Sequence, residues 1–417
     1  MSDPNEYPWT IDPPEPTNLV ALWPGEQPPM MTEVTAAFAA QLGEDLTVEQ
    51  DAPDDPTVLW AAAMAMGDID LTVWCEPARE LHPDELDDPA AATCRWIVGV
   101  ETVIDPDEAL AQFSMLMRLL AGTWQEIPAI LDVNTERWYP RQALDRTYGA
   151  EDEPAASVLW VVHVVEPRDG GDAWIHTHGL CRCSLPDLEM IAVPKRFVPA
   201  GVELVETIAG RMLEEMLPPS DEPFAVGPDL DVTFQPWRTV APADGPGGLV
   251  SRDDGPGNPH TGVRAVVCGA GSEVADRARW PQVAIECITT GRGAYFLCSH
   301  ETSRLARRAR AAWPKLVTVP LPAVQVLVKA GLAADDAQDE REHLWFSVRR
   351  FLDDRAEAQL LHEPGRVAMS KGDVIWIDRQ SVSDWTVVTP GGRFGPAQAE
   401  AMSAALAALY PTRETAP

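Results

Sequence analysis

The sequence contains no uninterrupted apolar run close to the roughly 18 residues that a membrane-spanning helix needs. Its first residues, Met1 to Glu15, are acidic and rich in proline, whereas a signal peptide starts with basic residues followed by an apolar stretch. The P-loop of nucleotide-binding proteins, the Gly-x-Ser-x-Gly turn of serine hydrolases and the His-Glu-x-x-His helix of zinc proteases are also missing. We therefore expect a cytoplasmic protein that does not contact a membrane and that carries none of these familiar catalytic motifs.

Lysine is scarce, with only four residues in 417, and the 32 basic residues face 65 acidic ones, which gives a net charge of −33. The first 78 residues carry fifteen acids, and the first basic residue is Arg79. Such a field repels phosphate backbones and anionic lipids, so the composition argues against nucleic-acid binding. A basic protein partner would suit it, although codon usage in a GC-rich genome and solubility at high salt are alternative explanations.

Cysteine is too sparse and too scattered for a disulfide framework. The seven cysteines are an odd number, and most lie inside apolar, strand-like runs such as 72–75 and 266–268. Small buried hydrophobic residues are the expected role for most of them.

The length of 417 residues and a hydrophobic content of 45% predict two to three folded domains. In the first part of the chain, apolar spacing predicts strands and helices in the order β-α-β-β-β-α-β, without the glycine-rich turns of dinucleotide-binding folds. The expected strands are 18–23, 57–66, 70–75, 94–103 and 127–131. Two helices are expected, the first with Thr32 as its N-cap and the second over residues 107–120. This pattern favours an α+β fold of antiparallel sheets flanked by helices.

The second part should open with a hairpin of strands 157–165 and 173–183 around the turn Arg168 to Asp172. Further elements are predicted as strands at 188–193, 229–237, 263–268, 282–288 and 294–298, and as helices at 202–216 and 302–313. Four prolines and six glycines between residues 241 and 262 indicate a linker or a long surface loop.

Closely spaced strands at 343–351, 356–361, 374–378 and 385–389, followed by a helix at 396–409, predict a small β-rich, barrel-like module at the C-terminus. The expected divisions are a tail at 1–16, an α+β domain at 17–150, a hairpin and helix region at 151–240, the linker at 241–262, an α+β region at 263–335 and the β-rich module at 336–417.

The densest group of functional residue types is the stretch from Trp174 to Glu189. Residues two apart on a strand share a face, so His176 and His178 can present both imidazoles to one metal ion. Cys181 and Cys183 could complete a zinc site, or Glu189 could join the histidines around a hydrolytic metal with an open position. Four ligands within eight residues is geometrically tight, and the alternative is that these side chains line one face of a buried hairpin.

Two resemblances to known families are visible. The run Asp132 to Trp138, the motif His176-Thr-His-Gly-Leu180 and the segment Leu188 to Met190 resemble bacterial proteins of domain of unknown function 4026, over about residues 18–240. The segments 342–346, 363–364, 371–373 and 383–385 resemble domain of unknown function 2314, a small β-rich module, over about residues 335–390. This chain has His362 where the second family has asparagine and Cys181 where the first has a polar residue. The resemblances imply architecture and no reaction.

Two functional hypotheses remain. The first is a non-enzymatic factor of immunity or regulatory type that binds a basic protein, with Trp345, Asp384 and Trp385 as possible contact residues. The second is a metal-dependent hydrolase that holds zinc or a related ion with His176 and His178, completed or oriented by Glu189 or Asp187.

Overall fold

The computed structural model describes residues 9–43, 46–53, 55–67, 69–79, 86, 88–149, 153–167, 170–227, 230–249, 262–270, 280–290, 296–321, 323–334 and 341–410. The chain divides into two compact units, Met1–Cys298 (unit 1) and Ser299–Pro417 (unit 2). Within the described ranges, no helix combines the length and the apolar character needed to cross a membrane. The predicted α+β class of antiparallel sheets with helices is confirmed.

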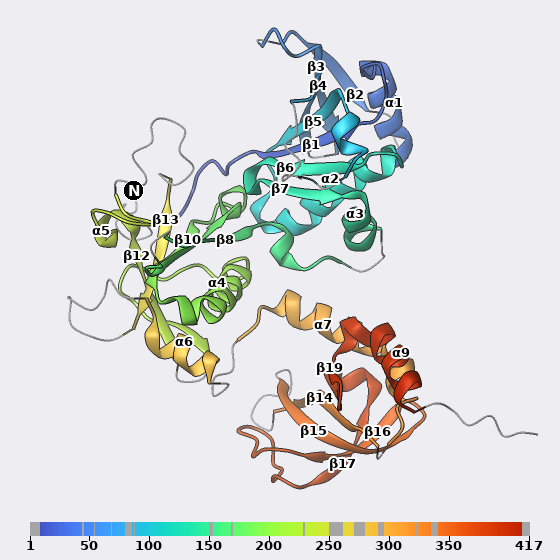
Figure 1. Cartoon of the computed structure of the whole chain (residues 1–417), viewed down its shortest axis with the longest axis vertical. Helices are drawn as coiled ribbons and strands as arrows, with labels where there is room; N and C mark the ends of the chain where they lie inside the picture. The colour runs from blue at the N-terminus through green and yellow to red at the C-terminus, as the bar shows by residue number, and fades with distance from the viewer. Residues whose placement is uncertain are drawn as a thin grey trace, which may run out of the picture. The chain divides into compact units, whose positions relative to one another are not determined.

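Unit 1 begins with a seven-stranded sheet in the order β2-β3-β4-β5-β1-β6-β7, and all its neighbouring strands are antiparallel. Helices α1, α2 and α3 lie together beside this sheet (Figure 1). Helix α2 buries Phe113, Met117 and Leu120 at the predicted helical spacing, and Asp105 accepts a hydrogen bond from the Asp107 N–H just before it. The elements are β1 (Thr17–Trp23), α1 (Met31–Leu42), β2 (Thr47–Asp51), β3 (Trp60–Met66), β4 (Ile69–Pro77), η1 (Ala91–Thr93), β5 (Trp96–Thr102), η2 (Pro106–Glu108), α2 (Ala109–Thr123), β6 (Ala129–Asp132), η3 (Val133–Thr135), β7 (Arg137–Pro140) and α3 (Arg141–Tyr148).

A six-stranded sheet in the order β11-β12-β13-β10-β9-β8 completes unit 1. Its β10 and β13 are parallel, and its other neighbouring pairs are antiparallel. The elements are η4 (Ala156–Val158), β8 (Val161–Val165), β9 (Ala173–His178), η5 (Leu180–Cys183), β10 (Asp187–Val193), η6 (Lys195–Phe197), α4 (Val198–Met212), β11 (Phe224–Gly227), β12 (Leu230–Pro236), α5 (Trp237–Val240), β13 (Arg264–Gly269) and α6 (Gln282–Thr289). One continuous apolar core contains residues from both sheets of unit 1.

The predicted linker precedes β13, which pairs with β10 and β12 in the middle of the second sheet. Most of the linker lies outside the described residues. The two compact units divide the chain between Cys298 and Ser299, and the finer domain boundaries stay predictions.

Unit 2 contains a six-stranded antiparallel sheet in the order β17-β16-β15-β14-β18-β19. Among its described strands, β17 and β19 are open edges, so the predicted barrel-like module is an open sheet and not a closed barrel. Its own core includes the fully buried rings of Trp313, Phe346 and Trp385. The elements are α7 (Ser299–Ala311), α8 (Trp313–Leu316), β14 (Gln325–Ala333), β15 (Arg341–Leu352), β16 (Arg355–Leu360), β17 (Val374–Asp378), η10 (Arg379–Ser381), β18 (Val382–Thr389), β19 (Gly392–Phe394), η11 (Pro396–Gln398) and α9 (Ala399–Leu409).

Several predicted elements differ from the structure. The apolar run 282–288 forms helix α6 and not a strand, because short apolar runs fit both periods and here Ala284 and Ile285 face the core of unit 1. The second hairpin strand ends at His178, and residues 180–183 form η5. Helix α1 has Met30 and not Thr32 at its N-cap. Of the predicted strand 294–298, residues 294 and 295 lie outside the described part, and residues 296–298 form no strand.

The predicted N-terminal tail is partly packed against the fold. Trp9 is only 5% exposed, and its indole Nε1 donates to the Pro218 carbonyl over 2.8 Å. The N–H groups of Ile11 and Glu15 donate to the carbonyls of Ser184 and Cys181. Residues 9–16, which we call the N-terminal segment, are therefore held against η5, and residues 1–8 lie outside the described part.

Candidate metal-binding site

Three histidines meet on one face of the β8–β9 hairpin. His163 of β8 lies directly opposite His176 of β9, and His178 lies two residues farther along β9 on the same face. The hairpin register therefore brings together three imidazoles that come from two strands, and this arrangement includes both histidines of the predicted pair.

The three imidazoles form a nearly equilateral triangle. Their ring centroids are 5.5 Å apart for His163 and His176, 5.0 Å for His163 and His178, and 4.9 Å for His176 and His178. One nitrogen of each ring lies within 4.8 Å of one nitrogen of each other ring. In a tetrahedral zinc site with Zn–N bonds near 2.0–2.1 Å, ligand nitrogens are roughly 3.3 Å apart, so small side-chain rotations would bring these three into bonding distance.

The surroundings of the three rings differ. His176 is buried, and its ring stacks on that of Trp174 with centroids 3.9 Å apart. His163 and His178 are partly exposed. The cluster therefore has one fixed inner ligand and two that reach solvent.

Gly179 explains why the chain leaves the strand immediately after His178. Its φ of +109° lies in a region that side-chain-bearing residues rarely adopt, and an added Cβ would lie 2.5 Å from the Leu159 carbonyl oxygen. The chain turns there into η5, which takes Cys181 and Cys183 off the strand face. Among the described residues, the group able to hold a metal consists of the three histidines and includes neither cysteine.

Burial also keeps the Cys181 and Cys183 thiols neutral in the metal-free protein. Burial raises the pKa of Cys183 to about 12, and it raises the pKa of Cys181 as well, with the Asp187 carboxylate adding to the effect. Both thiols therefore stay protonated at neutral pH.

Glu189 lies next to the cluster and not within it. It is directly opposite His176 across the β9–β10 pair, and its buried carboxylate lies 3.3 Å from the Arg264 guanidinium. Arg264 also donates to the Thr177 carbonyl and lies 3.6 Å from the Asp187 carboxylate. Glu189 is thus placed to fix the hairpin and the inner histidine, and a ligand role for it stays a prediction.

Asp187 is a second buried acid in this region. Burial raises its pKa, while Arg264 and the hydrogen bonds from Thr177 and the Leu180 N–H act in the opposite direction. Its oxygens are used to hold the β9–η5 corner, so we assign it a structural role.

A pocket of about 370 Å³ opens over the partly exposed histidines. His163 and His178 form one wall, and the first sheet of unit 1 supplies the other. The lining residues are Glu15, Pro16, Asn18, Glu101, Val133, Asn134, Glu136, His163 and His178. A metal held by the three histidines could therefore face a solvent-accessible space whose walls carry three carboxylates.

Hydrogen bonds order this wall of the pocket. The Asn134 side chain accepts from the Asn18 N–H and donates to the Pro16 carbonyl, and the Asn18 amide donates to Glu101 over 3.5 Å. Glu136 has a φ of 54°, a conformation uncommon for residues other than glycine and asparagine. The walls thus consist of positioned backbone and not of loose loops.

Sequence reasoning missed His163, because the register of the hairpin depends on its turn. Paired residues of β8 and β9 have numbers that sum to 339, which places His163 opposite His176. The predicted turn 168–172 is centred on residue 170 and would give a sum of 340, which pairs residue 163 with Thr177 and places it on the other face. A difference of one residue in register therefore decides whether His163 joins the cluster.

The other predicted contact residues lie in unit 2. Lys329 on β14 pairs with Trp345 on β15 and with Asp384 on β18, so these two residues lie on either side of it. Both are partly exposed, and burial raises the pKa of Asp384. Trp385 is fully buried, and its indole donates to the Ala309 carbonyl, so it has no surface to offer a partner.

The comparisons with known proteins agree with this architecture. Residues 161–263, which include the three histidines and end immediately before β13, match the family described as protein of unknown function (DUF4026), C-terminal. Residues 310–408 match the family described as uncharacterized protein conserved in bacteria (DUF2314). Both resemblances are confirmed. No curated protein and no solved structure shows significant similarity to the chain.

Proposed function

We propose that unit 1 is a metal-dependent hydrolase whose metal ion is bound by His163, His176 and His178. The observation that carries this proposal is the convergence of the three imidazoles, two of which, His163 and His178, line the pocket. Three neutral imidazoles with an open fourth position suit zinc and related transition ions, and that position can hold a water molecule.

The chemistry that such a site supplies is the activation of water. A bound divalent ion lowers the pKa of its water to about 7 and polarises a carbonyl oxygen of the substrate. Glu101 and Glu136 are the carboxylates on the opposite wall that could accept the proton of this water and return it to the leaving group. The acidic lining favours a neutral or cationic ester or amide over a phosphate ester.

In this proposal Glu189 orients the ring of His176, the buried ligand. Metal-bound histidines commonly donate their second N–H to a carboxylate, which fixes the ring. Glu189 is the cross-strand neighbour of His176, and its carboxylate is paired with the Arg264 guanidinium in the buried sheet. It is therefore a positioning residue.

The first test is elemental analysis of protein purified without a histidine tag or chelator. We expect close to one zinc, manganese or iron per chain, and its loss in His163→Ala and in His178→Ala while the circular dichroism spectrum is unchanged. His362→Ala, which removes a histidine of unit 2, is the matched control and should keep the metal. Metal-free, fully folded protein that also fails to take up added zinc would overturn the proposal.

Hydrolysis is tested separately with chromogenic acetate esters and anilides. Turnover should require the metal, and Glu101→Gln or Glu136→Gln should lower kcat while leaving the metal content intact. Glu49→Gln, on the exposed strand β2, is the control carboxylate. Metal binding without any metal-dependent turnover would leave a metal-binding protein and refute the hydrolase.

The second candidate function is the binding of a basic protein by a non-enzymatic cytoplasmic factor. The excess of 65 acidic over 32 basic residues supports it, because such a field attracts cationic partners and speeds their association. Capture from a host lysate at low salt should return a stoichiometric basic partner, and a variant with alanine at His163, His176 and His178 should bind it equally well. Absence of such a partner would remove this candidate.

A further inference from the structure

Two strand segments of unit 2 that carry the second family resemblance, in β15 and β18, meet on one face of its sheet. Strand β14 lies between them and pairs Lys329 with Trp345 on one side and with Asp384 on the other. His343 lies two residues from Trp345 on the same face, and it pairs with Gly331. We propose that this face binds a small monoanionic carboxylate whose planar apolar group contacts Trp345. The site lies in unit 2, so neither the proposed hydrolase nor the histidine cluster requires it.

This face is the one turned away from the core of unit 2. Side chains of successive strand residues alternate between the two faces of a sheet. Leu344, Phe346 and Trp385 belong to the core, together with residues of helices α7, α8 and α9. His343 and Trp345 therefore lie on the opposite face, where both are partly exposed and within reach of a ligand.

Gly331 allows basic side chains of two strands to converge. An added Cβ at this position would lie 3.0 Å from Cε1 and 3.3 Å from Nε2 of His343, and 3.3 Å from Cδ of Arg341. The imidazole and the Arg341 side chain therefore both lie over the Gly331 backbone, and the Arg341 guanidinium donates to the Gly331 carbonyl over 3.1 Å. Lys329 is two residues away on the same strand face, which is roughly 7 Å along the strand. The missing side chain thus brings three nitrogen-bearing groups to one spot.

Ser383 fixes the orientation of the imidazole. The register of β18 shifts between the partners of Lys329 and Ala330, and Ser383 is the extra residue at this bulge. Its hydroxyl lies 2.8 Å from His343 Nδ1 and 3.3 Å from the Lys329 carbonyl oxygen. With the hydroxyl proton on the shorter contact, Nδ1 accepts it and Nε2 carries the N–H. This N–H, over Gly331, is a donor for a ligand oxygen.

The charges at the site suit a monoanion. Lys329 and Arg341 are cationic, and burial together with these two charges lowers the pKa of His343, so its ring is neutral near pH 7. With Asp384 ionised, the site has a net charge of one positive unit. A carboxylate balances this charge, whereas a phosphate dianion would add repulsion from Asp384.

Asp384 does not use up the charge of Lys329. Its carboxylate accepts the Trp385 N–H over 2.7 Å, and among the described residues no ion pair joins it to Lys329, although the two are cross-strand neighbours. The ammonium group therefore keeps its donors for a ligand. Unit 2 as a whole does not repel an anion, because residues 299–417 contain 15 basic and 15 acidic residues and the net charge of −33 comes from residues 1–298.

Trp345 and Leu327 supply the apolar part of the site. Leu327 lies two residues from Lys329 on the same face, and both apolar side chains are partly exposed. An aromatic ring joined to the carboxylate by a short linker can pack against the indole while the carboxylate meets Lys329. An aryl alkanoate such as 3-phenylpropanoate has this form.

The test uses the full chain and three probes in isothermal titration calorimetry at pH 8. 3-Phenylpropanoate is the monoanion, 3-phenylpropanamide its neutral counterpart, and phenyl phosphate is a dianion at this pH. We expect the acid to bind about ten-fold more tightly than the amide, because the amide forms no charge-assisted hydrogen bonds with Lys329. Equal affinity for acid and amide, or tighter binding of the phosphate than of the acid, would overturn the proposal.

Variants locate the site. Lys329→Gln should weaken binding of the acid about ten-fold, and Arg341→Gln about three-fold because this side chain is exposed, while amide binding stays unchanged. Arg349→Gln is the matched control, because Arg349 lies on the same strand but donates to Gln359. Gly331→Ala removes no donor but displaces the His343 ring, so it should weaken binding of the acid as well. Unchanged binding in Lys329→Gln would refute the site.

Ring resonances of labelled histidines give an independent readout. Addition of 3-phenylpropanoate should shift the signals of His343, identified from His343→Gln, and leave those of the exposed His362 in place. Shifts of His362 without shifts of His343 would refute the site. N-acetylglycylphenylalanine carries the same carboxylate and ring at the end of a peptide. Tighter binding of 3-phenylpropanoate would identify a free acid as the ligand, and tighter binding of the peptide a protein C-terminus, and both results keep the carboxylate site.

Discussion

Arg182 and Asp132 form an ion pair whose side chains are both completely buried. One guanidinium nitrogen lies 2.7 and 3.0 Å from the two Asp132 oxygens, and Thr135 donates to the same carboxylate over 2.8 Å. The pair joins η5 of the second sheet to the end of β6 in the first sheet. Removing one partner would leave the other charge buried without compensation.

Asp132→Asn should therefore destabilise unit 1 by about 3–5 kcal/mol, measured as the free energy of unfolding in urea. Asp145→Asn breaks the exposed pair with Arg141, in which the Asp145 side chain is 57% exposed, and should cost less than about 1 kcal/mol. Equal decreases in the free energy of unfolding for the two variants would contradict the larger stabilising role that we assign to the buried pair.

His343 makes the stability of unit 2 dependent on pH. Burial lowers its pKa from the ordinary 6.5, and the charges of Lys329 and Arg341 lower it further, so the folded state binds this proton less tightly than the unfolded state. Its Nδ1 lies 2.8 Å from the Ser383 hydroxyl. Stability should thus be highest above pH 6.5 and fall as the pH decreases through and below that value.

His343→Gln should remove this part of the pH dependence, so that the stability difference between variant and wild type changes between pH 7.5 and 5. Urea unfolding at several pH values measures it, and His362→Gln serves as the control histidine of the same unit. A parallel pH profile for wild type and His343→Gln would show that the folded and unfolded states bind this proton equally.

The turn at Gly179 ends strand β9 directly after His178. Gly179 and Gly170 both have positive φ, but an added Cβ at Gly170 meets nothing within 4 Å, whereas at Gly179 it meets the Leu159 carbonyl oxygen. Alanine variants at the two positions therefore distinguish the cost of the backbone conformation alone from the added cost of a steric clash.

Gly170→Ala should cost about 1 kcal/mol for its backbone conformation alone, and Gly179→Ala should cost clearly more and also weaken metal binding. Thermal unfolding and zinc titration of both variants measure the difference. A Gly179→Ala protein as stable as Gly170→Ala would mean that the β9–η5 turn can relax around a methyl group.

Elements were predictable from the sequence where a long period supported them. Helix α2 and the hairpin of β3 and β4 lie close to the predicted ranges because their apolar residues follow one period over several turns or pairs. Helix α6 was not predictable in this way, because eight residues with many apolar side chains fit both the helical and the strand period. Its packing against α4 favours the helix.

The candidate site was predictable in the same partial way. Alternation along one strand was enough to pair His176 with His178, but His163 is a neighbour only through the hairpin register. The sequence could not show that Glu189 pairs with Arg264, 75 residues farther along the chain, because the parallel pairing of β10 and β13 leaves no local sequence pattern. The ligand role expected for Glu189 stays a prediction.

At the scale of the whole chain, the two units have separate cores. Among the described residues, the buried core cluster of unit 2 runs from Ala309 to Leu406, and the six strands of its sheet lie within that range. We therefore expect the fragment 299–417 to fold alone, with a cooperative thermal transition and dispersed amide resonances. A molten fragment would show that unit 2 depends on contacts from the rest of the chain.

Unit 1 should not tolerate a cut in the predicted linker. The fragment 1–262 lacks β13, which lies between β10 and β12, and it lacks Arg264, the partner of Glu189. It should show less sheet by circular dichroism and no metal binding, whereas the fragment 1–298 should keep both. Equal behaviour of the two fragments would support the boundary that the composition of residues 241–262 suggests.

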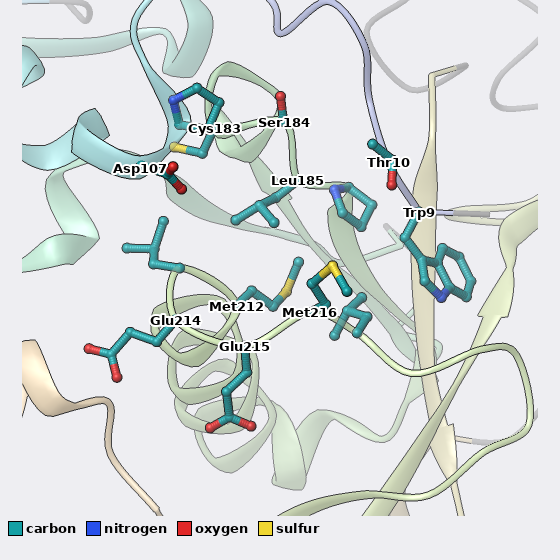
Figure 2. A pocket seen from close by; sticks show the side chains of 14 residues that line it. Trp9, Thr10, Asp107, Cys183, Ser184, Leu185, Met212, Glu214, Glu215 and Met216 are labelled. Atoms are coloured by element: carbon teal, nitrogen blue, oxygen red, sulfur yellow. The ribbon is translucent and has the colours of Figure 1, made fainter. Parts of the chain in front are cut away.

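The N-terminal segment forms part of the wall of two pockets in unit 1. Trp9 lines a pocket of about 300 Å³ at the end of helix α4 (Figure 2), while Glu15 and Pro16 line the one beside the histidines, and the N–H groups of Ile11 and Glu15 are hydrogen-bonded to η5 and Ser184. A ligand that orders one end of this short segment alters the entropy left to the other end. If a ligand occupies the Trp9 pocket, any factor by which it changes the affinity for metal must equal the factor by which metal changes the affinity for that ligand.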